Sequence, residues 1–216
     1  GGTARRCARL AGRVTVLNLG GTLSILVGLV AGAACAIAIL ASRRGVLIPA
    51  LLTQFICAAL LFSSLPTALV IAYCLVGVCV CGILAVTPVG AEAAGETRQV
   101  GLPSGLPFRV VAVLLVAIAS MSLARAVIGV GDAVAPGVSI GAGLLVGLGL
   151  LQVGLSEEPL RVGSGLMSVI GGFEIGYTTV ETAIALHGLI IGVPLLIALV
   201  VAYLLVLPRA GSEAAR

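Results

Sequence analysis

The chain has 216 residues, of which 60% are hydrophobic and only 9% are charged, and its formal net charge is +4. A soluble domain of this size would need far more polar residues to cover its surface. The composition therefore indicates an integral membrane protein folded as one compact bundle. It also argues against binding to nucleic acid, because the basic residues stand near segment ends and form no patch.

The apolar residues occur in continuous runs, which decides the fold class. A transmembrane barrel would alternate apolar and polar residues with a period of two. Helices satisfy their own backbone hydrogen bonds in lipid, and one spanning helix needs roughly 20 apolar residues. We therefore predict an all-α integral membrane protein, a bundle of about seven transmembrane helices. The expected spans run near 20–41, 46–63, 67–87, 108–128, 137–155, 164–185 and 189–207.

Polar breaks between these runs divide the chain into four parts. We expect a three-helix part at 1–90, a polar connecting loop at 91–107, a four-helix part at 108–207 and a polar tail at 208–216. An odd number of spans places the two termini on opposite faces of the membrane. More arginines fall on the face of the C-terminus, which favours a cytoplasmic C-terminus in a bacterial inner membrane.

Glycine is abundant, with 30 residues in the chain, and several glycines are spaced by four within the expected spans. Such pairs let helix backbones approach closely where no hydrophobic force drives association. The pairs are Gly28 and Gly32, Gly143 and Gly147, Gly172 and Gly176, and Gly188 and Gly192.

The sequence offers little to bind a metal or a cofactor. None of its six cysteines forms a CxxC pair, and we interpret those in the apolar runs as small buried residues. Haem or chlorophyll would need histidine ligands, and His187 is the single histidine. No HExxH or GxSxG motif occurs, so we expect no cofactor, no metal and no catalytic residues.

The sixth expected span contains the polar residues that call for an explanation. On a helix, Glu174 and Glu181 are separated by seven residues, so they share a face about 10 Å apart along the axis. Tyr177 and Thr178 lie between them at helical spacing. These four residues form one polar stripe, which would face protein or water because a carboxylate in lipid costs several kcal/mol.

The stripe predicts a path for protons. Glu174 is expected near the bilayer centre, where a carboxyl group can hold or release a proton as its surroundings change. Tyr177 and Thr178 can each donate and accept a hydrogen bond, and His187 follows at the exit of the helix. The alternative is structural: Glu174 would make a polar contact to a neighbouring helix, and His187 would be a solvated loop residue.

The motif GGFEIG at 171–176 resembles a known family. It is similar to the Gly-aromatic/aliphatic-Glu-Ile pattern of the K-type small membrane subunit of respiratory complex I, and component E of hydrogenase-4-type complexes carries a similar three-helix unit at its C-terminal end. The resemblance covers residues 137–207 and implies that Glu174 is the central proton-carrying glutamate. In that family a second glutamate stands on the following helix, whereas the expected span 189–207 contains no acid.

The resemblance implies a proton-conducting or proton-coupling subunit of a redox-driven complex. It would contact antiporter-like membrane subunits as well as the lipid bilayer, and it would not be an enzyme by itself. Two alternatives remain open from the sequence. The chain is a structural or assembly subunit with a degenerate proton path, or it is a stand-alone transporter of ions or small solutes.

Overall fold

The computed structural model describes residues 2–41, 44–62, 67–87, 105–128, 136–178 and 184–213, and within these ranges it contains seven helices and no strand. The helices are α1 Gly2–Leu40, α2 Arg44–Leu61, α3 Thr67–Val86, α4 Leu106–Ile128, α5 Pro136–Leu155, α6 Pro159–Tyr177 and α7 Ile184–Glu213. This confirms the predicted all-α fold and the number of helices.

Several helix boundaries differ from the predictions, including the starts of α6 at Pro159 and α7 at Ile184, each about five residues earlier than expected. α1 begins at Gly2, so the helix extends well before the apolar run. α7 continues to Glu213, through most of the expected polar tail at 208–216. α6 ends at Tyr177, whereas the sequence led us to expect a helix to about residue 185.

The early end of α6 has a local chemical reason. Thr178 follows the helix, and its hydroxyl donates a 2.7 Å hydrogen bond to the carbonyl of Ile175. A threonine hydroxyl that bonds to the backbone competes with further helical turns. Thr179 and Val180 come next in the sequence, and β-branched residues have low helix propensity. The apolar character of this stretch therefore predicted too long a helix.

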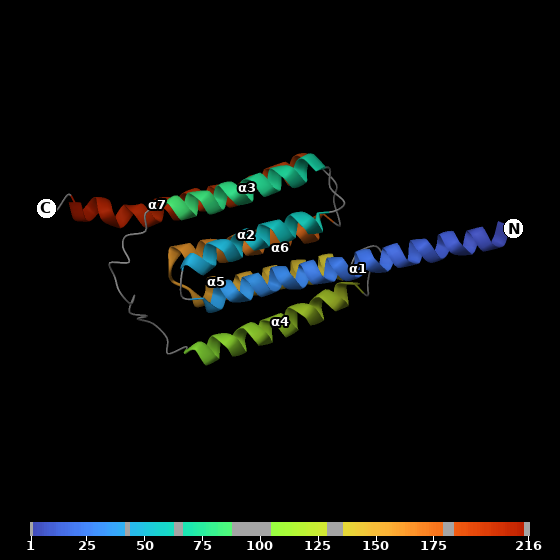
Figure 1. The fold of residues 1–216 in the computed structure, drawn as a ribbon. Helices are drawn as coiled ribbons and strands as arrows, with labels where there is room; N and C mark the ends of the chain where they lie inside the picture. Colours follow the sequence, from blue (N-terminus) through green and yellow to red (C-terminus); the bar gives the residue numbers. More distant parts are fainter. Residues whose placement is uncertain are drawn as a thin grey trace.

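The helices lie side by side along one common direction (Figure 1). α5 packs against α6, α1 and α4, while α2 bridges α1 and α3. α7 packs against α3 and α6. α4 therefore forms one edge of the bundle and the α3–α7 pair forms the other (Figure 1). The start of α1 and the end of α7 lie at opposite ends of the bundle, as an odd number of spans requires (Figure 1).

Among the described residues, five helices are long and apolar enough to cross a membrane: α1 from Gly21, α3, α4, α5 and α7. α2 has a shorter apolar stretch, Gly45–Leu61. α6 is less apolar, but ten of its 19 residues are buried, because it lies among α2, α5 and α7. In the spanning window of α4, by contrast, only 11% of the residues are buried. α6, which is less apolar than α2, α3, α4, α5 and α7, is thus shielded by its neighbours.

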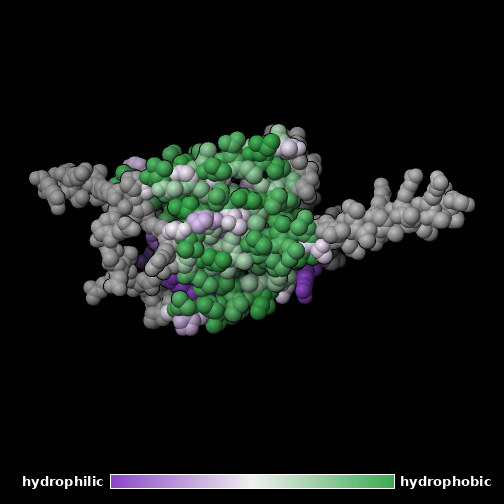
Figure 2. All heavy atoms as spheres, viewed as in Figure 1, coloured by the Kyte–Doolittle hydropathy of each residue, from purple (hydrophilic) through white to green (hydrophobic). Residues whose placement is uncertain are grey.

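The outer surface matches this arrangement. Figure 2 shows a face that is almost entirely hydrophobic over the described helices. On α4 the exposed side chains include Leu114, Leu115 and Ile118, each more than half accessible. Apolar side chains on the outside and polar ones inside are what a lipid environment requires. The chain is therefore an all-α, multi-pass membrane protein.

Close helix contacts depend on glycine at defined positions. A Cβ atom at Gly28 would lie 2.7 Å from the carbonyl oxygen of Gly137, so α1 and α5 meet backbone to backbone. Gly149 and Gly165 face each other across α5 and α6, where an added Cβ would come within 2.9 Å of the opposite carbonyl. These distances are too short for any side chain, which explains why glycine occupies both sides.

The expected glycine pairs have mixed outcomes. Five of the glycines lie close to a neighbouring helix: Gly28, Gly32, Gly143, Gly147 and Gly172. Gly176 makes only an ordinary contact with Ala142. The prediction was wrong for Gly188 and Gly192, because an added Cβ there meets no described atom within 4 Å. Spacing by four alone does not say which face of a helix is covered.

We predict that Gly149→Ala destabilises the bundle, because its new methyl group would overlap the backbone of α6 at Gly165. Overpacking of this kind costs about 1–3 kcal/mol. Gly154→Ala, on the same helix but facing open space, is the matched control and should leave stability unchanged. Thermal unfolding in detergent micelles measures both. Equal melting temperatures for the two variants would contradict the close approach of α5 and α6.

Candidate functional site

The buried polar residues of the bundle gather on one side of α6. We call this the α6 polar face and define it as Arg161, Ser164, Ser168, Glu174 and Thr178. All except Arg161 are buried. Arg161, Ser164 and Ser168 recur at intervals of three and four residues and so lie in one row on the helix. Glu174 and Thr178 form a second pair spaced by four, and the step of six residues turns Glu174 by about 120° from Ser168. A buried polar side chain needs hydrogen-bond partners, so this face determines what the neighbouring helices must offer.

At the N-terminal end of α6, Gln152 of α5 completes a small hydrogen-bonded group. Its side-chain amide donates to the hydroxyl of Ser164 at 2.6 Å and to the carbonyl of Arg161 at 3.2 Å. Ser164 donates to the same carbonyl at 3.0 Å. The side-chain oxygen of Gln152 is buried and accepts no hydrogen bond from the described residues.

Arg161 joins this end of α6 to α1. Its guanidinium donates to the carbonyl of Ala41 at 2.8 Å and pairs with Glu158 at 3.0 Å. Ala41 follows the last residue of α1, where backbone carbonyls have no partner within the helix. A charged donor there is favourable because of the partial negative charge at a helix C-terminus.

In the middle of the bundle, Ser168 contacts α2. Its hydroxyl lies 2.7 Å from the side-chain oxygen of Gln54 and donates a hydrogen bond to it. The carbonyl oxygen of Ser164, at 3.0 Å, is a second acceptor for the same hydroxyl. The buried thiol of Cys35 on α1 lies near both side chains. Three helices thus contribute polar atoms to one buried point.

A small cavity of about 10 Å³ adjoins this point. Its polar lining comes from Gln54 on α2, Ser168 on α6 and Tyr73 on α3, and Gly171 forms part of its wall. The ring of Tyr73 is fixed by two aromatic neighbours, with centroid distances of 5.4 Å to Phe55 and 4.9 Å to Phe62. The cavity lies between the Ser168 group and the C-terminal end of α6.

Glu174 lies three residues before the end of α6 and is fully buried. Neither of its carboxyl oxygens has a hydrogen-bond partner among the described residues. Tyr73 is close enough to interact with it electrostatically. The carboxyl group is therefore nearer to the helix end than we predicted, because α6 stops at Tyr177. Its burial is nonetheless complete, because α6 is surrounded by α2, α5 and α7.

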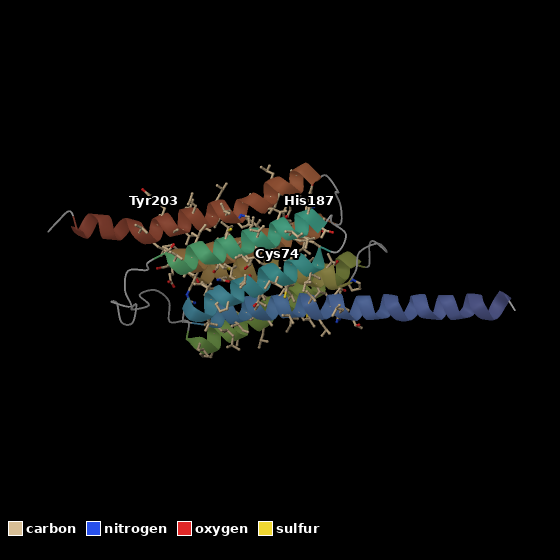
Figure 3. All side chains as sticks on the ribbon, turned by 45° about the horizontal axis from the view of Figure 1, so that its top comes forward. Cys74, His187 and Tyr203 are labelled. Carbon is tan, nitrogen blue, oxygen red and sulfur yellow. The ribbon has the colours of Figure 1, made fainter. Side chains whose placement is uncertain are left out.

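Beyond Glu174, the end of α6 meets the start of α7. The rings of Tyr177 and His187 lie 5.6 Å apart, and Phe173 stacks on Tyr177 at 5.8 Å. Figure 3 shows His187 toward the N-terminal end of α7 and Tyr203 toward the other end of the same helix. His187 is fully buried, so the alternative of a solvated loop histidine is wrong.

The structure thus brings most of the predicted site residues to one end of the bundle. Glu174, Tyr177, Thr178 and His187 all lie where α6 ends and α7 begins. Glu181 falls outside the described residues. The prediction that Glu174 and Glu181 share one helical face therefore stays a prediction, since only Glu174 belongs to the described part of α6.

The sequence analysis did not identify five polar residues that belong to the α6 polar face or lie near it: Gln54, Tyr73, Gln152, Ser164 and Ser168. The available signal was weak but real. Gln54 and Gln152 are isolated amides in apolar helices, and an amide in such a place needs a partner. Ser164 and Ser168 are spaced by four and precede Glu174 on the same helix.

These residues suit hydrogen bonding and proton transfer. They combine a carboxyl group, hydroxyls, amides and an imidazole, all of which accept hydrogen bonds, and all but the ionised carboxylate can donate them. Within the described part of the chain, no group of three or more His, Cys, Asp or Glu side chains is placed to hold a metal ion.

Comparison with known proteins adds no relative: no protein-family model matches the sequence, and neither a curated protein nor a solved structure does so.

Proposed function

We propose that the chain is a proton-conducting membrane subunit, and that protons move along the polar side of α6 by way of Glu174. The observation that carries this proposal is the state of Glu174: a carboxyl group with no exposed surface and no hydrogen-bond partner among the described residues. A purely structural carboxyl group would be expected to bond to a neighbouring helix, because burying it unpaired costs free energy.

Polar groups that could carry protons lie on both sides of Glu174 along α6. Toward the N-terminal end of α6 lie the cavity beside Tyr73, then Ser168 with Gln54, then Ser164 with Gln152. Toward the other end lie Tyr177 and His187. α6 has 19 residues and is therefore about 27 Å long, close to the thickness of the hydrocarbon core.

We further propose that the chain works inside a larger redox-driven complex, of the complex I or hydrogenase-4 type, with antiporter-like neighbours and a cytoplasmic C-terminus. The support is the GGFEIG motif, whose glutamate is the buried Glu174. The motif also stands on the helix before the last one, as the resemblance implies. In such a complex, a redox step elsewhere would change the surroundings of Glu174.

A structural role is the second candidate, and specific contacts favour it. Ser168 with Gln54 joins α6 to α2, and Gln152 with Ser164 joins α6 to α5. Such bonds hold membrane helices together, at about 1–2 kcal/mol each in model peptides. In this view the polar side of α6 serves packing alone. Glu174 separates the two candidates, because it makes no such bond to the described residues.

We predict that Glu174→Gln lowers proton flux about 100-fold, in line with the loss of an acid–base group. The amide keeps the size of the side chain but cannot give up a proton at neutral pH. The yield of folded protein should stay the same. The measurement is the rate of internal pH change in reconstituted vesicles under an imposed potential, with the whole complex reconstituted where it co-purifies.

Two further variants make the test sharper. Glu157→Gln changes an exposed carboxylate just before α6 and should conduct like the unsubstituted protein. Glu174→Ala also removes the volume of the side chain and tests packing. If Glu174→Gln conducts normally while Glu174→Ala loses the fold, Glu174 is a structural contact and the structural candidate is correct.

We also predict that the chain migrates with a large assembly when membranes are solubilised in mild detergent. Native gel electrophoresis followed by detection of a C-terminal tag measures this. An isolated monomer that still conducts protons would leave the role of Glu174 intact and would contradict membership in a complex.

A further inference from the structure

We propose that the cavity between α2, α3, α5 and α6 holds one water molecule, which links Ser168 to Tyr73 beside Glu174, and that Gly171 leaves the room for it. This inference deepens the proposed function and rests on it for the role of the water. The existence of the water site can be tested separately.

The need for a link follows from distance. Ser168 and Glu174 are six residues apart on α6, which corresponds to about 9 Å along the helix axis. A hydrogen bond joins heavy atoms about 2.7–3.2 Å apart, so the two side chains are too far apart for a direct proton transfer. The described residues offer no hydrogen bond that bridges them.

The cavity lies in this gap and has the size and lining that a water molecule needs. Its volume is about 10 Å³, close to the minimum for one water molecule. The hydroxyl of Ser168, the amide of Gln54 and the hydroxyl of Tyr73 belong to its lining side chains. A buried water makes about three hydrogen bonds, so these groups match its requirement.

Gly171 controls the width of the cavity. A Cβ atom added there would lie 3.1 Å from the hydroxyl oxygen of Tyr73, and it would meet no other described atom within 4 Å. The space in front of Gly171 is therefore bounded by the tyrosine hydroxyl and not by helix backbone. Glycine at this position is thus not needed for helix packing, unlike Gly149 or Gly165, and its effect is to leave room beside Tyr73.

Tyr73 brings the water to the neighbourhood of Glu174. Its hydroxyl can both donate and accept a hydrogen bond, and its ring is held by contacts with Phe55 and Phe62. Glu174 lies one helical turn beyond Gly171 and is close enough to Tyr73 for an electrostatic interaction, without a hydrogen bond between them. The water therefore extends the chain of polar groups from Ser168 to Tyr73, and Glu174 is the next polar group beyond Tyr73.

X-ray radiolytic labelling of the reconstituted protein in ¹⁸O water tests the site directly. Hydroxyl radicals form from bound water and oxidise the side chains that surround it. Tyr73 and Met167 line the cavity although each is only 2% exposed, so both should acquire the ¹⁸O label. Cys81 is buried on the same helix as Tyr73 but does not line the cavity, and it should stay unlabelled.

Gly171→Ala should abolish the label at Tyr73 and Met167, because its methyl group fills the cavity, and should lower proton flux about tenfold. Gly176→Ala is the matched control on α6, since its methyl group meets only Ala142 at 3.9 Å, and should change neither result. In the double variant Tyr73→Phe with Gly171→Ala, the lost hydroxyl makes room again, so the label at Met167 should return.

Several outcomes would overturn the inference. An unsubstituted protein without label at Tyr73 and Met167 has no water there, and this result decides the matter even if Gly171→Ala does not fold. An unchanged label in a folded Gly171→Ala protein would also refute the site. If the label is present but Glu174→Gln conducts normally, the water site stands and the proposed function fails. If Glu174→Gln blocks conduction but no label appears, the proposed function stands and the water site is refuted.

Discussion

The bundle depends on one constraint, which is that the polar side of α6 must be kept away from lipid. A hydrogen-bonding group in hydrocarbon has no water to bond to, so each must find its partner in another helix. Gln54 and Gln152 supply such partners from α2 and α5, and Arg161 reaches the end of α1. The same constraint explains why α6 is central although it is less apolar than the five helices α2, α3, α4, α5 and α7.

Backbone contact between helices makes this shielding possible. Two amide side chains can reach Ser164 and Ser168 only if α2 and α5 approach α6 closely. Gly149 and Gly165 allow that approach on one side, because nothing larger fits between the two backbones. The small residues and the polar residues of α6 therefore act together. The small residues allow the short distance between helices, and the polar residues form hydrogen bonds across it.

The fold could be predicted from composition because continuous apolar runs and polar breaks report directly on helices in lipid. The site was only partly predictable. Glu174 stands out in any apolar run, whereas Gln54 and Tyr73 acquire their roles from helices far away in the sequence. The early end of α6 was missed because hydropathy does not register that Thr178 bonds to the backbone.

The attachment of α6 at its two ends is unequal, and this has a mechanical consequence. One end is fixed by a charged hydrogen bond from Arg161 to the end of α1. The other end rests on ring contacts between Tyr177 and His187, which tolerate sliding. Glu174 lies about 20 Å from Arg161 along α6, so the charged hydrogen bond anchors the far end of the helix only. The position of the Glu174 carboxyl group is set instead by the close contact of Gly172 with α5 and by these rings.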